Sequence, residues 1–563
     1  MINKLGVSTV FLTLSVSAHA NDGITTASLG ERVVALGQNG TPSNGDTWDS
    51  AWAPNGDLYL QHNDGTGFDN GTYVHDRICS LQGTPELPST LLGVNLNPGR
   101  VANSLNGWPC YSTGLYEVDG MLYHNVCYSQ QIPGAFVFHH TSMMKSFDGG
   151  KTWINHLGQT NAPPPDDPNT CMFPSESWGQ VNFVKYRADG AAPAVDNAQT
   201  YVYLCGTSSG FRLARIKRLD LPLLDRTRIQ YYIGGDGSLD SSWSGDINGS
   251  VSLSTPSVSP TAVIYDEPLG RYVMTSFSSD SWTTPPIEST LRVVEAPHPW
   301  GPWRLILDEN VNNFEGDNLT WAFIVPKFTS PDGRKLWMSV SGRAPYGLQF
   351  VPVYLSTELV QTQEAETAQT TGGVISTAVP GYSGTGYVSG LDAIGKKCEF
   401  TFIVPVAGAY ILKLRYNTSA YRNLGLFVDS QQRSVLKLGK SQQVYATWTE
   451  MSTITWLDSG TNHVGLECID NSGNVNLDKV SVGLYSTSGV AGLSSKPLSA
   501  LDQSVQLDLA TVPGLFYSIY WKTNLSLELP WRPFTNFLGL GRTFQFVYPA
   551  SEPEGFLRVQ AGP

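Results

Sequence analysis

The sequence carries little charge, and it has no run of basic residues. Only 15% of its 563 residues are charged, and 48 acidic against 35 basic residues give a net charge of −13. Nucleic acids and anionic membrane surfaces attract proteins through basic patches. The composition therefore argues against nucleic acid and against an anionic membrane surface as partners.

Long apolar runs are absent after the N-terminus. The first twenty residues, MINKLGVSTVFLTLSVSAHA, combine a lysine, an apolar stretch and an Ala-His-Ala end, which is the pattern of a secretory signal peptide cleaved after Ala20. No later segment approaches the ~20 apolar residues that a membrane-spanning helix needs. We expect a secreted protein, extracellular or periplasmic, with no membrane span.

Cysteine is scarce, and its spacing argues against a zinc site. The seven cysteines include no Cys-x-x-Cys pair. In an exported protein they could form disulfides, although an odd number leaves at least one free. Cys398 and Cys468 stand apart from the others in the chain and are the candidate pair.

Glycine, proline and aromatic residues are plentiful instead. The 56 glycines, 35 prolines and 11% aromatic residues are typical of an all-β chain, and a chain of this length should form two to four domains. One strand pattern, a turn followed by alternating apolar and aromatic residues, occurs five times at intervals of 64–80 residues: NGDLYLQ from 55, DGMLYHN from 119, QTYVYLC from 199, LGRYVMT from 269 and GRKLWMS from 333. This long period predicts a five-bladed β-propeller over residues 21–360, in preference to one large β-sandwich.

Aspartates flank the first of these strands. Asp46 and Asp64 stand at either end of DTWDSAWAPNGDLYLQHND, although aspartate weakens strands and is costly to bury. From adjacent antiparallel strands, both could reach the central funnel, where two carboxylates push their pKa values apart. The alternative for Asp64, in NDGTG, is a turn former.

A third carboxylate, Glu176, stands beside Trp178 where a strand should leave the funnel. A carboxyl group against an indole has a raised pKa and can act as a general acid. The alternative is an exposed loop glutamate. The candidate substrate-binding residues of the propeller are Trp48, Trp52, Trp178, His62, His124 and Asp317, of which the two histidines could instead fill the interior of their sheets.

The sequence pattern changes after the fifth repeat. Short strands with Gly-rich turns predict a β-sandwich over residues 362–486 and a small accessory β-domain over residues 487–563. The order Glu-Ala-Glu, GYSGTGY, AGAYILKLRY and NLD resembles the β-sandwich carbohydrate-binding modules appended to xylanases, mannanases and galactanases.

The resemblance to carbohydrate-binding modules implies a structural calcium ion held by Glu364, Glu366 and Asp478. Carboxylate oxygens suit a hard cation, and the alternative is a solvated edge strand. The resemblance also implies sugar contacts on loops, although any of these residues could belong to the core. The candidates are Tyr387, Tyr421, Trp448 and Asn474.

The first part of the chain resembles the five-bladed propeller glycoside hydrolases and a related family once catalogued as a domain of unknown function. The resemblance rests on DTWDSAW with GDLYLQHNDGTGF, VDGMLY, MFP, EAPHPWGPWRL and PKFTSPDGRKLW, and on SFDGGKTW, which fits the Asp-box turn of sialidase-type propellers. That family includes bacterial endo-D-arabinanases, which cleave furanosidic polymers. Where it tends to have Gly-Asp-Gly in the first blade, this chain has Asn63, Asp64 and Gly65.

Together these features predict a monomeric, secreted glycoside hydrolase that cleaves a polysaccharide with paired carboxylates. Asp46 is the expected base or nucleophile, Glu176 the expected acid, and Asp64 the residue that tunes or positions them.

Two alternatives use the same fold. A polysaccharide lyase could take its base from Tyr123, His124 or Tyr128, although the acidic composition disfavours the polyanionic substrate of a lyase. A non-catalytic glycan-binding protein would pair its funnel carboxylates with arginines.

Overall fold

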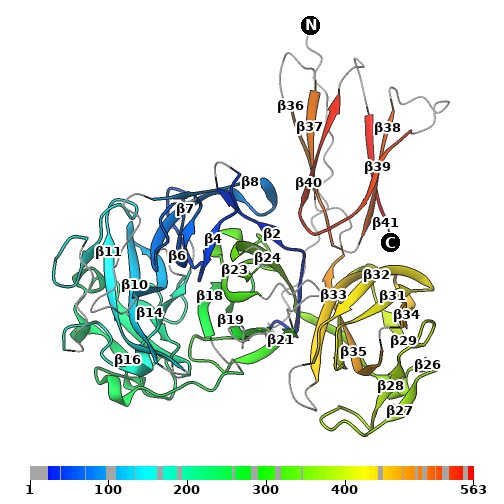
Figure 1. Ribbon diagram of the computed structural model, residues 1–563, viewed down its shortest axis with the longest axis horizontal. Coiled ribbons are helices and arrows are strands. Elements are labelled where there is room, and N and C mark those ends of the chain that lie inside the picture. Colours follow the sequence, from blue (N-terminus) through cyan, green and yellow to red (C-terminus); the bar gives the residue numbers. More distant parts are fainter. Residues whose placement is uncertain are drawn as a thin grey trace.

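The computed structural model of the protein is built almost entirely of β-strands (Figure 1). It describes residues 23–562 except 38–39, 70, 97–109, 133–134, 162–168, 187–192, 209, 257–259, 280–288, 311–318, 344–345, 442–447, 472, 488–491, 498–503, 514, 523–531 and 550–555. Across these described ranges, no helix has the length and apolarity that a membrane crossing needs. The helices that they contain are three-residue 3-10 turns: η1 (Glu176–Trp178), η3 (Leu221–Leu223), η4 (Arg226–Arg228), η5 (Asp240–Ser242), η6 (Ile247–Gly249), η7 (Pro326–Phe328) and η8 (Ala365–Thr367).

The five repeated sequence patterns lie in strands, and each belongs to a different group of mainly antiparallel strands. The first group contains β3 (Leu36–Gly37), β4 (Asn44–Asp46), β5 (Ser50–Trp52), β6 (Leu58–Gly67), β7 (Arg77–Thr84) and β8 (Leu87–Asn95). The second contains β9 (Cys110–Val118), β10 (Met121–Ile132), β11 (Ala135–Ser146) and β12 (Ile154–Asn155).

The third and fourth groups are joined edge to edge by β13 and β18, which pair in parallel. The third group contains β13 (Val181–Lys185), β14 (Tyr201–Gly206), β15 (Arg212–Lys217), β16 (Gln230–Tyr232) and β17 (Trp243–Ser244). The fourth contains β18 (Pro260–Asp266), β19 (Arg271–Ser279), β20 (Ser289–Ala296) and β21 (Arg304–Asn310).

The fifth group brings the two ends of this region together. Its strands β22 (Thr320–Ile324), β23 (Lys335–Arg343) and β24 (Tyr346–Ser356) are joined by β1 (Thr26–Leu29) and β2 (Val33–Val34), which pair antiparallel with β24. Strands from both ends of the region thus complete one sheet.

The apolar core consists of clusters that each join two neighbouring groups. Trp48 and Trp337 belong to a cluster between the first and fifth groups, and Ala51 and Trp153 to one between the first and second. Further clusters join the second group to the third, the third to the fourth and the fourth to the fifth. Every group therefore packs against two others, in an order that returns to its starting point.

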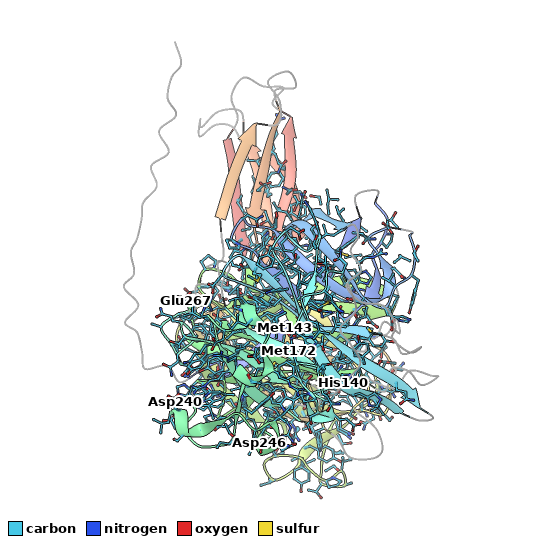
Figure 2. The ribbon with its side chains drawn as sticks, turned by 90° about the vertical axis from the view of Figure 1, so that its left-hand side faces the viewer. His140, Met143, Met172, Asp240, Asp246 and Glu267 are labelled. Carbon is cyan, nitrogen blue, oxygen red and sulfur yellow. The ribbon has the colours of Figure 1, made fainter. Side chains whose placement is uncertain are left out.

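Figure 2 shows the face formed by the second and third groups. Met143 and Met172, which belong to the cluster between these groups, lie toward the middle of the view, and Asp240 and Asp246 lie toward its edge. The apolar side chains are held between sheets, while charged turns form the rim.

The Asp-box turn has the expected form. Asp148 Oδ1 accepts the N–H groups of Lys151 and Thr152 at 3.1 and 2.8 Å, and Ser146 Oγ donates to the same oxygen at 2.9 Å. Trp153 is buried, and its Nε1 donates to Gly150 O at 3.0 Å. The turn thus positions the Trp153 ring, which packs between the second group and the first.

One ion pair is buried where the first three groups meet. Lys185 Nζ, on β13, donates to Asp49 Oδ1 and, at 2.8 Å, to Ser50 O. Asp49 also accepts the N–H of Leu115 on β9 at 3.2 Å, and neither charged side chain is exposed. Burial lowers the pKa of Lys185, and the adjacent Asp49 carboxylate opposes that shift.

A two-sheet sandwich follows, with apolar side chains of both sheets forming one core. One sheet contains β25 (Glu358–Glu364), β27 (Val374–Ser376), β28 (Tyr387–Leu391), β30 (Gly408–Asn417), β33 (Thr449–Leu457) and β35 (Val475–Ser486). The other contains β26 (Gln369–Thr371), β29 (Lys397–Val404), β31 (Arg422–Val428), β32 (Gln431–Leu438) and β34 (Gly460–Cys468).

The candidate disulfide within the sandwich is wrong. Cys398 and Cys468 are both buried and free. They lie on neighbouring strands, but Cys398 is directly opposite Leu466 rather than Cys468, so the register separates the two thiols.

Two three-stranded sheets end the chain, above the junction of the other two bodies in Figure 1. They contain β36 (Gly492–Pro497), β37 (Ser504–Ala510) and β40 (Thr543–Pro549), and β38 (Phe516–Lys522), β39 (Arg532–Leu538) and β41 (Phe556–Gly562). Their cluster includes Tyr517 together with Tyr354 of β24 and Ile411 of β30. The three bodies therefore share one apolar joint.

Candidate active site

Asp46 ends β4 and is only 5% exposed. Its carboxylate accepts hydrogen bonds from the hydroxyls of Thr47 and Tyr346, each at 2.8 Å. Tyr346 is the first residue of β24, so the first and fifth groups build this site together across 300 residues of chain.

The backbone is in a disfavoured conformation at Asp64 and at Thr47, the residue that follows Asp46. Thr47, which follows Asp46, has φ +58°, and Asp64 has φ +50°. This left-handed region is costly for residues other than glycine, above all for a β-branched residue such as threonine. Strands β4 and β6 also shift register between Asn44 and Asp46. Such strain and such bulges occur preferentially at functional sites, where they aim side chains.

Asp64 lies in β6 next to Asn63, the residue that pairs with Asp46. Its Oδ1 is 2.5 Å from His75 Nδ1, and the two side chains are 25% and 38% exposed. The rings of Tyr73 and Tyr111 meet the His75 imidazole edge to face, each with a centroid distance of 5.6 Å. The partly exposed Asp64 carboxylate therefore contacts an imidazole that packs against two tyrosine rings.

The surroundings raise the pKa of the buried carboxylate. Burial raises the pKa of Asp46 to about 7, the hydrogen bonds from Thr47 and Tyr346 oppose the shift, and the charge of Asp64 adds to it. The pKa of Tyr73 is raised by burial and then by the charge of Asp64. Asp46 can therefore hold a proton up to neutral pH beside a second carboxylate that reaches solvent, which is an arrangement suited to proton transfer.

A buried network lies behind His75. The next residue, Asp76, accepts a hydrogen bond from the Ser112 hydroxyl and lies 3.2 Å from His124 Nε2. The His124 ring packs against Trp153 of the Asp-box turn at a centroid distance of 5.4 Å. The segment that carries His75 is thus anchored to the second group of strands.

The surroundings of Glu176 differ from those predicted. Its side chain is 72% exposed and lies 3.6 Å from His139 Nδ1. The ring of Trp178 instead packs into the core against Phe173 and Tyr231. The predicted pairing of this carboxyl with the indole is wrong, because the short helix η1 directs the indole inward and leaves the carboxylate in water; the exposed-loop alternative describes it.

The predicted stacking role of two tryptophans is also wrong. Trp48 and Trp178 are fully buried, so neither offers a ring face to a sugar. Trp48 Nε1 donates to Gly45 O at 2.9 Å and so fixes the turn after β4. Trp52 is half-buried and packs beside the cluster between the first and fifth groups.

The histidines singled out in the sequence fill the interior of their sheets. His62 and His124 are fully buried, and burial lowers the pKa of His62 to about 4. Tyr123 and Tyr128, the other candidate bases of a lyase, are at most 1% exposed and out of reach of a substrate. Asp317 lies outside the described residues.

Two of the predicted calcium ligands meet at Ser383 in the sandwich. The Ser383 hydroxyl lies 2.6 Å from Glu364 and 3.0 Å from Asp478, either of which can accept its one proton, and the Ser383 N–H donates to Asp478 at 2.8 Å. The Arg415 guanidinium also donates to Asp478.

The third predicted ligand, Glu366, has an oxygen without a hydrogen-bond partner. Its Oε1 accepts the N–H of Thr385 at 2.6 Å, and its Oε2 is buried and unbonded. A buried carboxylate oxygen without a hydrogen-bond partner suits a hard cation. As they stand, however, no three His, Cys, Asp or Glu side chains in the described ranges are grouped to hold a metal ion.

The predicted sugar contacts of the sandwich divide into buried and accessible residues. Tyr387 is 2% exposed and Trp448 9%, and their rings meet at a centroid distance of 5.0 Å. The Asn474 amide is used within the fold, in hydrogen bonds of 2.7 and 2.8 Å. Tyr421 is half-buried. Tyr387, Trp448 and Asn474 therefore support the fold, while Tyr421 is partly exposed.

Sequence reasoning missed most of the groups that surround the two aspartates. Nothing local marks Tyr346, because it reaches Asp46 from the other end of the region. A local signal existed for one segment: TYVHD closely follows NDGTGF and places a tyrosine and a histidine near Asp64 in the chain. The missed residues are Thr47, Tyr73, His75, Tyr111 and Tyr346.

Two family models match the chain. Residues 110–350 match the one described as "Domain of unknown function (DUF4185)", and residues 361–485 match "Carbohydrate binding module (family 35)". Each segment is thus similar to the family whose model it matches, and the second segment, called the family 35 module below, forms the observed sandwich.

Curated relatives of the chain are carbohydrate-active enzymes. A 1,6-α-glucosyltransferase of Sporosarcina globispora is 29% identical over 148 residues, which are 26% of this chain and 11% of the relative. A cycloisomaltooligosaccharide glucanotransferase of Niallia circulans is 34% identical over 129 residues, which are 22% of this chain and 13% of the relative. The chain thus spans little more than a tenth of the length of either protein.

Solved structures are similar to different parts of the chain. A family 35 carbohydrate-binding module of Clostridium thermocellum is 26% identical, with a TM-score of 0.21, over 22% of this chain and 95% of its own. An exo-β-1,3-galactanase of Phanerochaete chrysosporium, solved with β-1,3-galactotriose, is 10% identical, with a TM-score of 0.37, over 81% of this chain and 100% of its own.

Proposed function

We propose that the protein is a secreted glycoside hydrolase that cleaves a polysaccharide between Asp46 and Asp64. The observation that carries this proposal is the asymmetry of the two aspartates: one is buried with a pKa of about 7, and its coupled neighbour is partly exposed and bonded to an imidazole. Glycoside hydrolysis needs one carboxyl group that gives a proton and one carboxylate that activates water or attacks the sugar.

In this proposal Asp46 is the general acid and Asp64 the base or nucleophile. The assignment differs from the expectation that Asp46 is the base and Glu176 the acid, because burial favours the protonated form of Asp46 whereas the Glu176 side chain is 72% exposed. Asp46 protonates the leaving glycosidic oxygen, and Asp64 acts on the anomeric carbon or on a water beside it.

The catalytic region is proposed to be a five-bladed β-propeller. The cyclic order of the core clusters supports this architecture, since sheets stacked in a closed ring each pack on two neighbours. The sheet that joins β1 and β2 to β24 supplies a closure for the ring. In such a ring, the ends of β4 and β24 that carry Asp46 and Tyr346 would lie at one mouth, with Asp64 of β6 and His75 beside them.

The partners of the two aspartates favour an enzyme over a glycan-binding propeller. A purely structural pair would be neutralised by arginine, whereas Asp46 is bonded by hydroxyls and Asp64 by His75. The lyase alternative loses support because its candidate bases are buried.

The family 35 module is proposed to bind the polysaccharide and to hold a structural calcium ion. Glu364, Glu366 and Asp478 would hold the ion, and the unbonded Glu366 Oε2 supports a ligand there. The ion would neutralise carboxylates and tie the loop at Ser383 to β25 and β35. We further propose export with cleavage near Ala20, a monomeric state, and an accessory role for the C-terminal sheets.

The function is tested by digestion of a panel of neutral and uronate-containing polysaccharides with the wild type, Asp46→Asn and Asp64→Asn. New reducing ends without ultraviolet-absorbing unsaturated ends are expected from the wild type, and loss of the new reducing ends from the variants. Asp57→Asn, in an exposed turn of the same group, is the matched control. Equal activity of all four proteins would show that Asp46 and Asp64 are not catalytic. Unsaturated products would show that the protein is a lyase and not a hydrolase.

A further inference from the structure

The two aspartates of the candidate site compete for a proton. The charge of Asp64 is among the causes that raise the pKa of Asp46, so the pair resists holding two negative charges. Coupled carboxylates of this kind take up one proton between them, and their surroundings determine where it resides.

The hydrogen-bond donors of the two aspartates differ in kind. Asp46 is bonded by two neutral hydroxyls, whereas Asp64 is bonded by His75 Nδ1 at 2.5 Å. Imidazole is the side chain whose charge ordinarily changes near neutral pH, and a charged donor stabilises a carboxylate more than a neutral one. The titratable groups that face Asp64 are Asp46 of β4, Tyr73 and His75 of the segment before β7, Tyr111 of β9 and Tyr346 of β24.

The position of His75 is fixed from several sides. Tyr73 and Tyr111 meet its ring edge to face, and Asp76, the next residue, is tied to Ser112 and His124 in the buried network. The imidazole is thus aimed at Asp64 by packing rather than by the Asp64 contact alone.

We propose that His75 is a positioning residue that keeps Asp64 in its carboxylate form and thereby leaves the shared proton on Asp46. The proposal rests on the function proposed above, and it assigns to one residue the division of two aspartates into acid and base. His75 acts through Asp64 and needs no contact with the substrate.

The first test needs no substrate. Histidine in the full chain is isotopically labelled at Cε1, and NMR follows the titration of His75 in the wild type and in Asp64→Asn, with His75→Asn to assign the resonance. His298, which lies 2.8 Å from Asp196 in another part of the fold, is the internal reference. We expect the His75 midpoint to fall by about one pH unit or more in Asp64→Asn, the size of effect that loss of an adjacent opposite charge produces. An unchanged His75 midpoint overturns the proposal.

The second test uses activity on whichever polysaccharide of the panel the wild type cleaves. His75→Ala removes the donor, and His75→Asn keeps an N–H donor that cannot become charged. The acid limb of the kcat/KM profile should move to higher pH by about one unit in His75→Ala and by less in His75→Asn, with KM changed less than about twofold. His298→Asn, which removes a similar His–Asp pair, should leave the profile in place. A profile unmoved by both His75 variants overturns the proposal, and melting curves verify that the variants fold.

The two proposals fail in different ways. If Asp46→Asn and Asp64→Asn keep full activity, the catalytic function is wrong, and the His75 proposal falls with it even where the NMR coupling is present. If both are inactive but neither the His75 midpoint nor the pH profile responds, the hydrolase stands and the role of His75 is wrong.

Discussion

Asp46 and Asp49 belong to the same short segment, GDTWDS, yet the structure surrounds them in opposite ways. Asp49 is fully buried and paired with Lys185, with Ser50 and Leu115 N–H groups on its oxygens. Asp46 is almost as buried, but its partners are hydroxyls, and its pKa rises to about 7. Burial alone therefore does not set the protonation state of an aspartate; the charge of its partners contributes as well.

Loss of the Asp46 proton is expected to have the largest effect. Asp46→Asn keeps the shape of the side chain and removes the acid, so kcat should fall about 10²–10⁴-fold. Release of reducing ends measures the loss, with Asp57→Asn as the control. A kcat within twofold of the wild type would make Asp46 as structural as Asp49.

The same variant tests the stability side of the comparison. The pKa of Asp46 rises from 3.8 to about 7 on folding, so this group stabilises the fold fully at low pH, and the stabilisation is lost as the pH rises through about 7. Asp46→Asn cannot ionise and should therefore be more stable than the wild type above pH 7. Melting curves across pH test this, and a variant less stable at pH 8 would contradict the buried, uncompensated acid.

Breaking the Asp49–Lys185 pair should damage the fold rather than the chemistry. Lys185→Met leaves a buried carboxylate without its partner, which costs about 3–5 kcal/mol. Chemical denaturation measures this, and the double variant Asp49→Leu/Lys185→Met should recover part of the loss. Arg228→Ala breaks an exposed ion pair with Asp225 and should cost no more than about 1 kcal/mol. If Lys185→Met lowers the free energy of unfolding by no more than the control variant does, the Asp49–Lys185 pair is not important for the fold, and the contrast between Asp49 and Asp46 is wrong.

Calcium extends the comparison to carboxylates neutralised by a metal. If Glu366 is a ligand, calcium at a hundred times its Kd should stabilise the family 35 module in the full chain by about 2.7 kcal/mol, and a chelator should remove this. Differential scanning calorimetry measures the effect of the chelator on the wild type and on Glu366→Gln, and only the wild type should respond. A wild type that ignores the chelator would contradict the calcium site.

The smallest expected effect comes from one hydroxyl. The Tyr346 hydrogen bond opposes the rise in the pKa of Asp46, so Tyr346→Phe should raise that pKa further. The alkaline limb of kcat/KM should then move to higher pH, by about one unit or less. Tyr410→Phe, which removes a hydroxyl bonded to Val406 O in the sandwich, is the matched control. A shift of the alkaline limb to lower pH would show that the Tyr346 hydrogen bond raises the pKa of Asp46, contrary to this prediction.

The elements were largely predictable and their partners were not. Alternating apolar residues after a turn located β6, β10, β14, β19 and β23, because strand periodicity is a property of neighbouring residues. The same local reasoning treated Trp48 and Trp178 as exposed, since a single tryptophan carries no sign of the sheet that will cover it.

The catalytic candidates divide in the same way. Asp46 and Asp64 were recognisable because aspartates in strands are unusual, and the structure brings them together on adjacent strands. Glu176 was chosen for its neighbour in sequence, but a short helix separates the two side chains.

Composition and short-range pattern were sufficient for the all-β class, the repeated strands, the Asp-box turn and the sandwich module. Which aspartate meets a lysine and which meets a tyrosine depended on packing between groups, because Lys185 lies 136 residues from Asp49 and Tyr346 lies 300 from Asp46. A carboxylate takes its protonation state from the charges and burial around it, and those are supplied by chain segments that no local pattern connects.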